Sequence, residues 1–148
     1  MFNWGDDTWR DRVLTSDGWY RTGDLGYVDE DGYVFLGGRA DNQIATGGIK
    51  VTPEEIEQII DTHPQVAAVA ILGVEDERWG QRIVAMVVTR DKGLDAKALD
   101  QWCRAEDRLA SFKCPKEWHF IEALPQTSVG KLDRKALPDL LLRSRTAK

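Results

Sequence analysis

The chain has 148 residues, of which 42% are hydrophobic and 30% are charged, enough to bury an apolar core in one globular domain or slightly more. Its formal net charge of -5 argues against nucleic acid as the main partner. The sequence contains neither an apolar run of membrane-spanning length nor an amino-terminal signal pattern, so we expect a cytoplasmic protein that does not bind membranes.

The amino-terminal quarter of the chain predicts turn-rich β-structure. Residues 1–16 show no clear period and are expected to be irregular. Residues 18–38 contain short β-type runs, and Asp29–Gly32 between the last two predicts a hairpin turn with glycine at positive φ. These runs are Trp19–Thr22, Gly26–Val28 and Tyr33–Leu36. We expect unpaired strand edges and exposed aromatic side chains in this segment.

The next stretch predicts a turn and then a helix. Gly47 and Gly48 permit positive φ, which suits either a simple hairpin turn or a close approach of the backbone to a ligand. Thr52 is a candidate N-cap, Pro53 suits the first helical position and Glu55 occupies the capping-box position. An apolar stripe follows, and His63-Pro64 should end the helix.

Beyond this helix, strands and helices alternate. Val66–Val74 and Ile83–Thr89 are apolar throughout, as strands covered on both faces would be, and a charged loop joins them. Asp95 should cap a helix that runs to about Leu109, and Trp118–Ile121 reads as a third strand. Asp133 can cap a last helix, in which Pro138 forces either an early stop or a restart. The order predicts an α+β fold: a small three-stranded sheet with packed helices, preceded by the β-hairpin-rich segment.

The sequence contains two cysteines, Cys103 and Cys114, and two histidines, His63 and His119. This set supports neither a zinc site nor a disulfide framework, so we expect buried or half-buried free thiols and no metal site.

Two separate motifs carry a family resemblance. GWYRTGDLGYVDEDGYVFLGGRADNQIATGGIKVTPEEIE and LPQTSVGKLDRKAL resemble the hinge region and the terminal lysine motif of the adenylate-forming, AMP-binding superfamily of acyl- and aryl-CoA ligases, peptide-synthetase adenylation domains and luciferases. The likeness runs from about Asp17 to Leu137 and is closest to chlorobenzoate- or benzoate-type CoA ligases. It implies that residues 1–40 end the large amino-terminal domain and that residues 41–148 form a mobile carboxy-terminal lid. The family's amino-terminal phosphate-binding loop is absent from this sequence, so the chain looks like the carboxy-terminal piece of an enzyme.

The resemblance assigns three residues to the nucleotide and the hinge. Asp24 matches the aspartate that binds the ribose hydroxyls of ATP, and Arg39 matches an arginine that reaches the same ribose. Asp41 matches the hinge residue of the family. From the residues alone, Asp24 also suits a turn, and Arg39 a weak surface ion pair with Asp41.

A second group is implied for CoA. Gly47 and Gly48 match the loop that lines the tunnel for the pantetheine arm. The nucleotide-contacting positions of the chlorobenzoate-type enzymes match Trp79, Phe112 and Lys116. An indole can stack on adenine, and a lysine can pair with a phosphate. Core packing is the alternative for both aromatic residues, and Cys114 stands where that subgroup has an arginine.

Lys131 is the candidate catalytic residue. Pro125 and Leu132 occupy positions at which a Walker loop needs Gly and Ser or Thr, so Gly130-Lys131 is not such a loop. In the resembled family this lysine bridges the carboxylate substrate and the α-phosphate. Acetylation would remove its charge, which makes a lysine acetyltransferase and a deacetylase candidate partners.

The expected function is therefore that of a carboxy-terminal fragment of an ATP-dependent acid–thiol ligase, inactive alone, whose parent uses ATP, Mg²⁺ and CoA. The substrate is a carboxylic acid, and the resemblance around Trp79 favours an aromatic one. Two alternatives stay open: an adenylation domain that loads a carrier protein, which Leu132–Pro138 also resembles, and a free-standing lid-like binding module that is not an enzyme.

Overall fold

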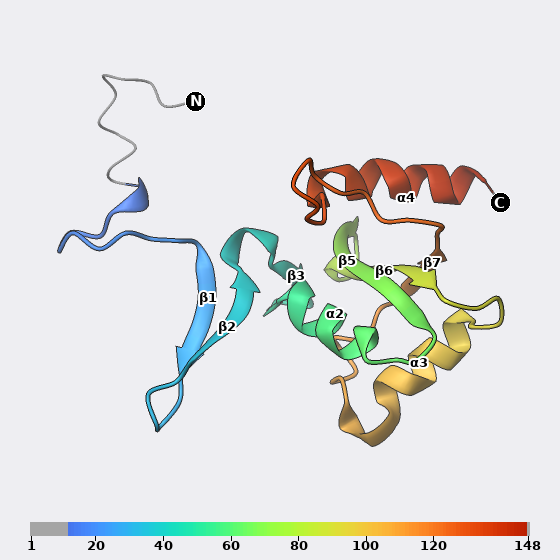
Figure 1. Cartoon of the computed structure of the whole chain (residues 1–148), viewed down its shortest axis with the longest axis horizontal. Helices are drawn as coiled ribbons and strands as arrows, with labels where there is room; N and C mark the ends of the chain where they lie inside the picture. The colour runs from blue at the N-terminus through green and yellow to red at the C-terminus, as the bar shows by residue number, and fades with distance from the viewer. Residues whose placement is uncertain (1–11, 148) are drawn as a thin grey trace. The chain divides into compact units, whose positions relative to one another are not determined.

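The computed structural model describes residues 12–147, which divide into two compact units, one ending at Asp41 and the other beginning at Asn42 (Figure 1). Most of the segment predicted to be irregular, residues 1–11, lies outside this range. No helix within the described range is long and apolar enough to cross a lipid bilayer.

The first unit is built on a β-hairpin. Strands β1 (Asp24–Val28) and β2 (Val34–Arg39) pair antiparallel, with a β-bulge between Leu25 and Gly26. Asp29 stabilises the connecting turn, because its Oδ1 accepts hydrogen bonds from the backbone N–H groups of Asp31 (3.0 Å) and Tyr33 (2.9 Å). Gly32 takes φ of +88° in this turn, as predicted.

One predicted strand of the first unit is wrong. Trp19–Thr22 forms no strand: Tyr20 makes only an isolated bridge with Leu14. Trp19 belongs instead to a turn that Thr15 stabilises, because Thr15 Oγ1 accepts a hydrogen bond from the backbone N–H of Trp19 at 2.9 Å.

The sheet of the first unit has two strands among the described residues, and neither of its faces is covered. Large apolar side chains on and before the hairpin are exposed, as expected. They are Trp19, Tyr20, Tyr27, Val28, Tyr33, Val34, Phe35 and Leu36. Tyr27 and Phe35 stack on one another with ring centroids 5.0 Å apart.

The second unit contains a mixed five-stranded sheet in the order β4-β3-β6-β5, with β7 also paired to β6. Its strands are β3 (Ile44–Thr46), β4 (Ile49–Val51), β5 (Val66–Asp76), β6 (Gly80–Thr89) and β7 (Glu117–Phe120). The prediction of an α+β domain is confirmed, and β5, β6 and β7 are the three predicted strands. The predicted number is too low because residues 44–51 add a short hairpin to the sheet.

Strands β5 and β6 are also longer than predicted. They pair antiparallel from Val66↔Thr89 to Asp76↔Gly80, so Glu75, Asp76 and Gly80 of the expected charged loop belong to the strand ends. Strand β7 runs parallel to β6, as the crossover through the intervening helix allows.

Helices cover both faces of this sheet. Figure 1 shows α2 (Pro53–Asp61) and α3 (Ala96–Arg104) on one side and α4 (Leu137–Thr146) on the other. Along β6, Ile83, Ala85 and Val87 point into the cluster shared with α2 and α3, while Val84 and Met86 point into the cluster under α4. Two-sided burial explains why β5 and β6 read as continuous apolar runs.

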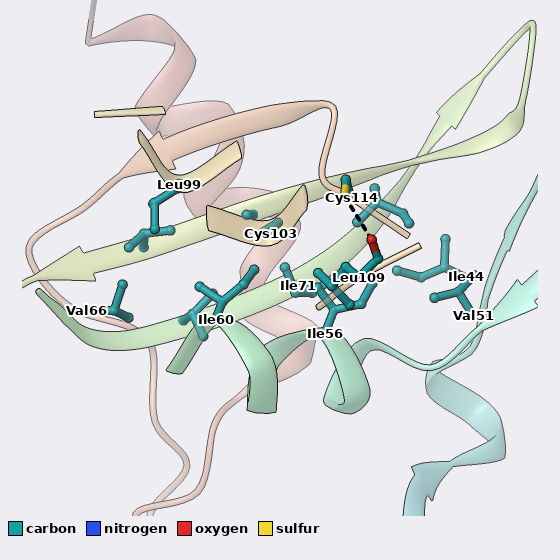
Figure 2. Close-up of a cluster of buried hydrophobic side chains, with 14 of the residues drawn as sticks. Ile44, Val51, Ile56, Ile60, Val66, Ile71, Leu99, Cys103, Leu109 and Cys114 are labelled. Atoms are coloured by element: carbon teal, nitrogen blue, oxygen red, sulfur yellow. Dashed lines mark hydrogen bonds between the residues drawn. The ribbon is translucent and has the colours of Figure 1, made fainter. Parts of the chain in front are cut away.

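The larger of the two clusters lies under α2 and α3 (Figure 2). Ile56 and Ile60 of α2 meet Leu99 and Cys103 of α3 over the sheet, and all four side chains are fully buried. Cys103 and Cys114 are free buried thiols, which confirms that prediction.

The observed helix ends agree with the predicted ones only in part. Asp95 caps α3 as predicted, because its Oδ1 accepts a hydrogen bond from the N–H of Ala98 at 2.8 Å. Helix α3 nevertheless ends at Arg104, not near Leu109, because Glu106 and Asp107 adopt positive φ and turn the chain through the short 3-10 helix η2 (Ala105–Asp107).

The capping box predicted for α2 does not form. The side chain of Thr52 makes no capping hydrogen bond, and Glu55 is instead paired with Lys113 at 2.6 Å. At the last helix, Asp133 accepts from the N–H of Lys135 and starts the 3-10 helix η3 (Arg134–Ala136). Helix α4 begins anew with Pro138 in its first turn, which is the restart that the proline allowed.

Candidate functional site

The first unit brings the three predicted nucleotide and hinge residues together at the end of its hairpin. Arg39 Nη1 lies 3.1 Å from Asp24 Oδ1, and Arg39 Nη2 lies 3.2 Å from Asp41 Oδ2. Arg39 Nη1 also donates to the carbonyl oxygen of Thr22 at 2.7 Å. The hydrogen bonds to Asp24 and Asp41 raise the pKa of the Arg39 guanidinium.

Gly23 makes room for this arginine. It has φ of +79°, and a Cβ at this position would lie 2.9 Å from Arg39 Nη2. The cluster therefore presents one cation and two carboxylates to solvent on a fixed backbone. Carboxylates accept hydrogen bonds from hydroxyl groups, so the donor and acceptor set fits a ribose.

Gly47 and Gly48 form the turn between β3 and β4, with φ of +58° and +80°. The backbone N–H of Gly47 donates to the carbonyl oxygen of Trp79 at 2.8 Å. A Cβ at Gly47 would lie 3.4 Å from Trp79 Cε3. The hairpin turn is thus observed, and the group that closely approaches Gly47 is the indole of Trp79.

Trp79 lies in the turn between β5 and β6. Asp76 Oδ1 accepts hydrogen bonds from the N–H groups of Arg78 (2.9 Å) and Trp79 (3.0 Å), which fixes the turn. The guanidinium of Arg78 lies over the indole at 4.9 Å, and Trp79 keeps 39% of its surface exposed. An indole in the core would be covered, so this one is available for stacking.

A concave surface lies beside this turn, lined by Glu75, Asp76, Glu77, Gly80 and Gln81. Three of these side chains are carboxylic acids. Negative charge on this surface disfavours phosphate groups, whereas the exposed guanidinium of Arg78 attracts them.

Phe112 and Lys116 lie in the loop between η2 and β7. Phe112 is 40% exposed, which places it at the surface and not in the core. Lys116 Nζ lies 3.4 Å from the carbonyl oxygen of Ser111, while its backbone N–H donates to Ile83 of β6. Cys114 is buried, and its burial raises the pKa of the thiol.

Lys131 stands at the tip of a tightly bonded loop between β7 and α4. The carbonyl oxygen of Lys131 accepts from the N–H of Thr127 at 2.7 Å, and the N–H of Asp133 donates to the carbonyl of Pro125 at 2.9 Å. Gly130 has φ of +81°, which a turn with this geometry requires. The backbone of the loop is therefore well defined, and Lys131 itself is exposed.

Two ionic clusters of the second unit were not predicted. Arg134 forms a forked pair with Glu57 of α2, at 2.9 Å from Nη1 to Oε1 and 2.8 Å from Nη2 to Oε2. The quoted motif contains Arg134 and the acidic run TPEEIE contains Glu57, but nothing in the sequence pairs them. Removing one partner of such a largely buried pair costs about 3–5 kcal/mol.

The second cluster centres on Glu117 of β7. This carboxylate is bonded to Arg82 of β6 (2.9 Å), Arg145 of α4 (2.7 Å) and the buried ring of His119 (2.6 Å). His119 Nδ1 lies 2.8 Å from Ser144 Oγ of α4. The cluster ties the last helix to the sheet.

Residues 55–131 match the AMP-binding enzyme C-terminal domain, a stretch that is more than half of the chain. The chain belongs to this family. The AMP-binding enzyme C-terminal domain contains Trp79, Phe112, Lys116 and Lys131, while the residues assigned to the nucleotide, the hinge and the glycine pair precede the matched stretch.

Relatives of this domain include several ligases. The 4-chlorobenzoate–CoA ligase of Arthrobacter sp is 46% identical over 125 residues, which are 84% of this chain and 24% of that enzyme. The fatty acid–[acyl-carrier-protein] ligase ScoC of Streptomyces coeruleorubidus is 43% identical over 83% of the chain and 24% of that protein. Among solved structures, ATP-bound MatB from Rhodopseudomonas palustris superposes with a TM-score of 0.84 at 33% identity, covering 93% of this chain and 27% of that one.

The chain thus spans about a quarter of the length of the relatives that it matches. Within the described residues, no group of three or more His, Cys, Asp or Glu side chains is arranged to hold a metal ion. The structure brings Asp24, Arg39 and Asp41 together. It places the indole of Trp79 against Gly47, while Phe112 and Lys131 lie on two further loops.

Proposed function

We propose that this chain is the lid portion, with the end of the preceding domain, of an ATP-dependent acid–thiol ligase. The enzyme would convert a carboxylic acid and ATP into an acyl-adenylate and pyrophosphate, and then transfer the acyl group to CoA. The observation that carries the proposal is the loop of Lys131, an exposed ammonium group on a hydrogen-bonded glycine turn. The identity to 4-chlorobenzoate–CoA ligase supports it and favours an aromatic acid.

In the first half-reaction, a carboxylate oxygen of the substrate attacks the α-phosphorus and pyrophosphate leaves. Negative charge gathers on the phosphoryl oxygens and on the carboxylate, and the ammonium of Lys131 would stabilise it. Asp24 would accept hydrogen bonds from the ribose hydroxyls, while Arg39, held by two carboxylates, would donate to the same sugar. Mg²⁺ would accompany the ATP phosphates, and no residue of this chain is assigned to it.

In the second half-reaction, the thiol of CoA attacks the acyl carbonyl and AMP leaves. Gly47 and Gly48 would line the path of the pantetheine arm, because a larger side chain would narrow it. Trp79 would stack on the adenine, with Phe112 and Lys116 on the next loop as further contacts. The acidic surface beside Trp79 would repel phosphates, whereas the guanidinium of Arg78, stacked on the same indole, would attract them.

Alternation between these half-reactions needs a hinge, which we assign to Asp41. The division of the described residues between Asp41 and Asn42 supports this assignment and the boundary between residues 1–40 and 41–148. A cytoplasmic location suits a ligase that uses ATP and CoA.

A second candidate function is an adenylating enzyme that loads a carrier protein. The likeness to a protein named fatty acid–[acyl-carrier-protein] ligase favours it. A free-standing binding module is the third reading. An exchange of pyrophosphate into ATP by the full-length protein would rule out the free-standing binding module. The thiol that then accepts the acyl group, CoA or a carrier protein, distinguishes the two enzymes.

The role of Lys131 is tested by separating the half-reactions in the full-length protein. Lys131→Ala should lower the single-turnover rate of acyl-adenylate formation by about 10²–10³, the usual cost of losing one such donor. The same variant, given synthetic acyl-adenylate and CoA, should form the thioester at close to the unmodified rate. Acetylation of Lys131 should reproduce this pattern, because it also removes the charge.

Lys135→Ala is the matched control, because Lys135 is another exposed lysine shortly after the same turn. It should change neither rate. A fall of both half-reactions in Lys131→Ala would contradict the assignment of the lysine to adenylation alone.

A further inference from the structure

The segment directly after the loop of Lys131 is bound to α2 and β5 through the side chain of Arg134. Arg134, in the 3-10 turn directly after the loop, donates from Nη1 and Nη2 to the two carboxylate oxygens of Glu57 at 2.9 and 2.8 Å. Its Nη1 also donates to the carbonyl oxygen of Ile71 on β5 at 3.3 Å. Such a forked arrangement fixes both the position and the plane of the guanidinium.

Glu57 is itself held from a second side. Its Oε1 accepts a hydrogen bond from the backbone N–H of Ile71 at 2.8 Å, so the carboxylate bridges α2 and β5. The side chains of Arg134 and Glu57 keep only 24% and 15% of their surface exposed. Burial alone would lower the pKa of the Arg134 guanidinium, but the hydrogen bond to Glu57 and the nearby carboxylate charges together outweigh it and raise the pKa, so Arg134 stays charged.

The loop also makes apolar contacts with the rest of the second unit. Leu132 packs against the cluster under α4, where Leu137 is fully buried. Apolar contacts hold the loop on the sheet, but they are non-directional and do not fix its orientation. The hydrogen bond between Asp133 N–H and the carbonyl of Pro125 closes the loop, so an orientation imposed at Arg134 is passed to Lys131.

The same acidic helix reaches the residue that follows Asp41. Glu54 Oε1 accepts from Asn42 Nδ2 at 2.8 Å and lies 3.6 Å from Arg134 Nη2. The contacts therefore run from Asn42 through α2 to Arg134.

We propose that Arg134 is a positioning residue for Lys131, and that its forked pair with Glu57 sets the orientation of the lysine loop on α2 and β5. The inference rests on the function proposed above for Lys131 and adds to it a residue that does not touch the substrate. Arg134 acts through Lys131: it directs where the ammonium group points when the adenylate forms.

The test uses the full-length protein and two conservative variants. Arg134→Lys keeps the charge and loses the fork, and Glu57→Gln keeps an acceptor for the N–H of Ile71 and loses the ionic pair. Each should lower the single-turnover rate of acyl-adenylate formation by up to about 10², the effect of a misplacement of around 1 Å. Each should leave thioester formation from synthetic acyl-adenylate near the unmodified rate. If Arg134→Lys does not fold, the same pair of rates in Glu57→Gln decides.

A double-mutant cycle separates positioning from general support of the fold. In a Lys131→Ala background, Arg134→Lys should cause no further loss of adenylation, because there is no ammonium left to position. A further loss as large as that in the unmodified background would overturn the proposal. So would a parallel fall of both half-reactions in Arg134→Lys and Glu57→Gln.

Glu55→Gln is the matched control, since it removes another ion pair of α2, the one with Lys113, away from the lysine loop. It should leave adenylation unchanged. If Lys131→Ala itself does not impair adenylation, the proposed function of the lysine fails. If Lys131→Ala impairs it and neither Arg134→Lys nor Glu57→Gln does, only the present inference fails.

Discussion

At the scale of single residues, Cys103 lies on α3 and Cys114 in the loop before β7, and both side chains are fully buried. Burial, with a smaller contribution from Cys114, raises the pKa of the Cys103 thiol to about 12. Only the thiolate reacts with alkylating reagents, so this environment makes the thiol inert.

We therefore expect neither cysteine to be alkylated in the folded chain near neutral pH. With a pKa of about 12 in place of an ordinary value of about 9, the thiolate fraction of Cys103 falls by about 10³. Mass spectrometry after exposure to iodoacetamide measures the modification, and the chain unfolded in urea, where both thiols should react, is the control. Rapid labelling of either cysteine in the native chain would contradict the burial seen here.

Cys114 also bears on the proposed CoA site. It stands where the resembled subgroup has an arginine, and its buried thiol cannot contact a phosphate. Lys116, on the same loop, and Arg78, stacked on Trp79, are exposed cations of this region. Lys113 of the same loop is paired with Glu55.

At the scale of elements, Glu117 joins three parts of the second unit. It bonds to Arg82 of β6 and Arg145 of α4, and to His119, two positions further along its own strand. Burial acts to raise the pKa of Glu117, but the hydrogen bonds from His119, Arg145 and Arg82 outweigh it and lower the pKa to about 2.

This shift predicts a dependence of stability on pH. The folded pKa lies below the ordinary value of 4.5, so the stabilisation is present above about pH 4.5 and is lost as the pH falls towards 2. A shift of this size corresponds to on the order of 3 kcal/mol of unfolding free energy. Glu117→Gln should therefore be less stable near neutral pH and lose less stability on acidification, as urea unfolding across this range would show.

Glu106→Gln serves as its control, because Glu106 is a highly exposed carboxylate. It should leave the acid dependence unchanged. An acid dependence in Glu117→Gln as steep as that of the unmodified chain would mean that other carboxylates govern acid unfolding.

The elements that were predicted are those whose burial leaves a pattern in consecutive residues of the sequence. Strands β5 and β6 are buried on both faces and therefore read as apolar runs. Helix α2 has an apolar stripe and a proline after its end, so its sequence also predicted it. Strands β3 and β4 have three residues each, which is too short for a period to be seen. The early end of α3 depends on positive φ at Glu106, which is not a residue type that signals it.

The candidate site was predictable to the same extent. Its residues stand in motifs that can be read along the chain, and the resemblance implies the roles that we propose for them. The partners that hold them could not be read: Arg134 and Glu57 are 77 positions apart, and α2 offers three other acidic residues to a distant cation. The packing of the whole unit selects Glu57 over Glu54, Glu55 and Asp61 as the forked partner of Arg134.

At the scale of the whole molecule, the two units differ in how much they bury. The hairpin of the first has two strands and exposed apolar faces, whereas the sheet of the second has five strands and helices on both faces. A two-stranded hairpin alone is marginally stable in water.

Hydrogen exchange should reflect this difference. In the chain studied as a monomer, amides of β1 and β2 should exchange fast, and amides of β5 and β6 should exchange slowly, near the limit set by global unfolding. Mass spectrometry of peptides from the two hairpins measures both. Equal protection in a monomer would show that the first unit has its own stable packing, and protection that grows with concentration would reveal pairing between copies.

The long β5–β6 hairpin also has a consequence for the order in which the second unit forms. Its strands are joined by the short turn at Glu77–Trp79 and stay in continuous register from there to Ala68↔Val88. Closing a short turn loses little chain entropy, so this pair can form before any distant segments meet. Strand β7 can add to β6 only after the crossover through α3 is in place, and α4 then covers the second face of a sheet that already exists. The loop of Lys131 lies between β7 and α4, so the group proposed to do the chemistry would be among the last parts of the chain to take its native shape.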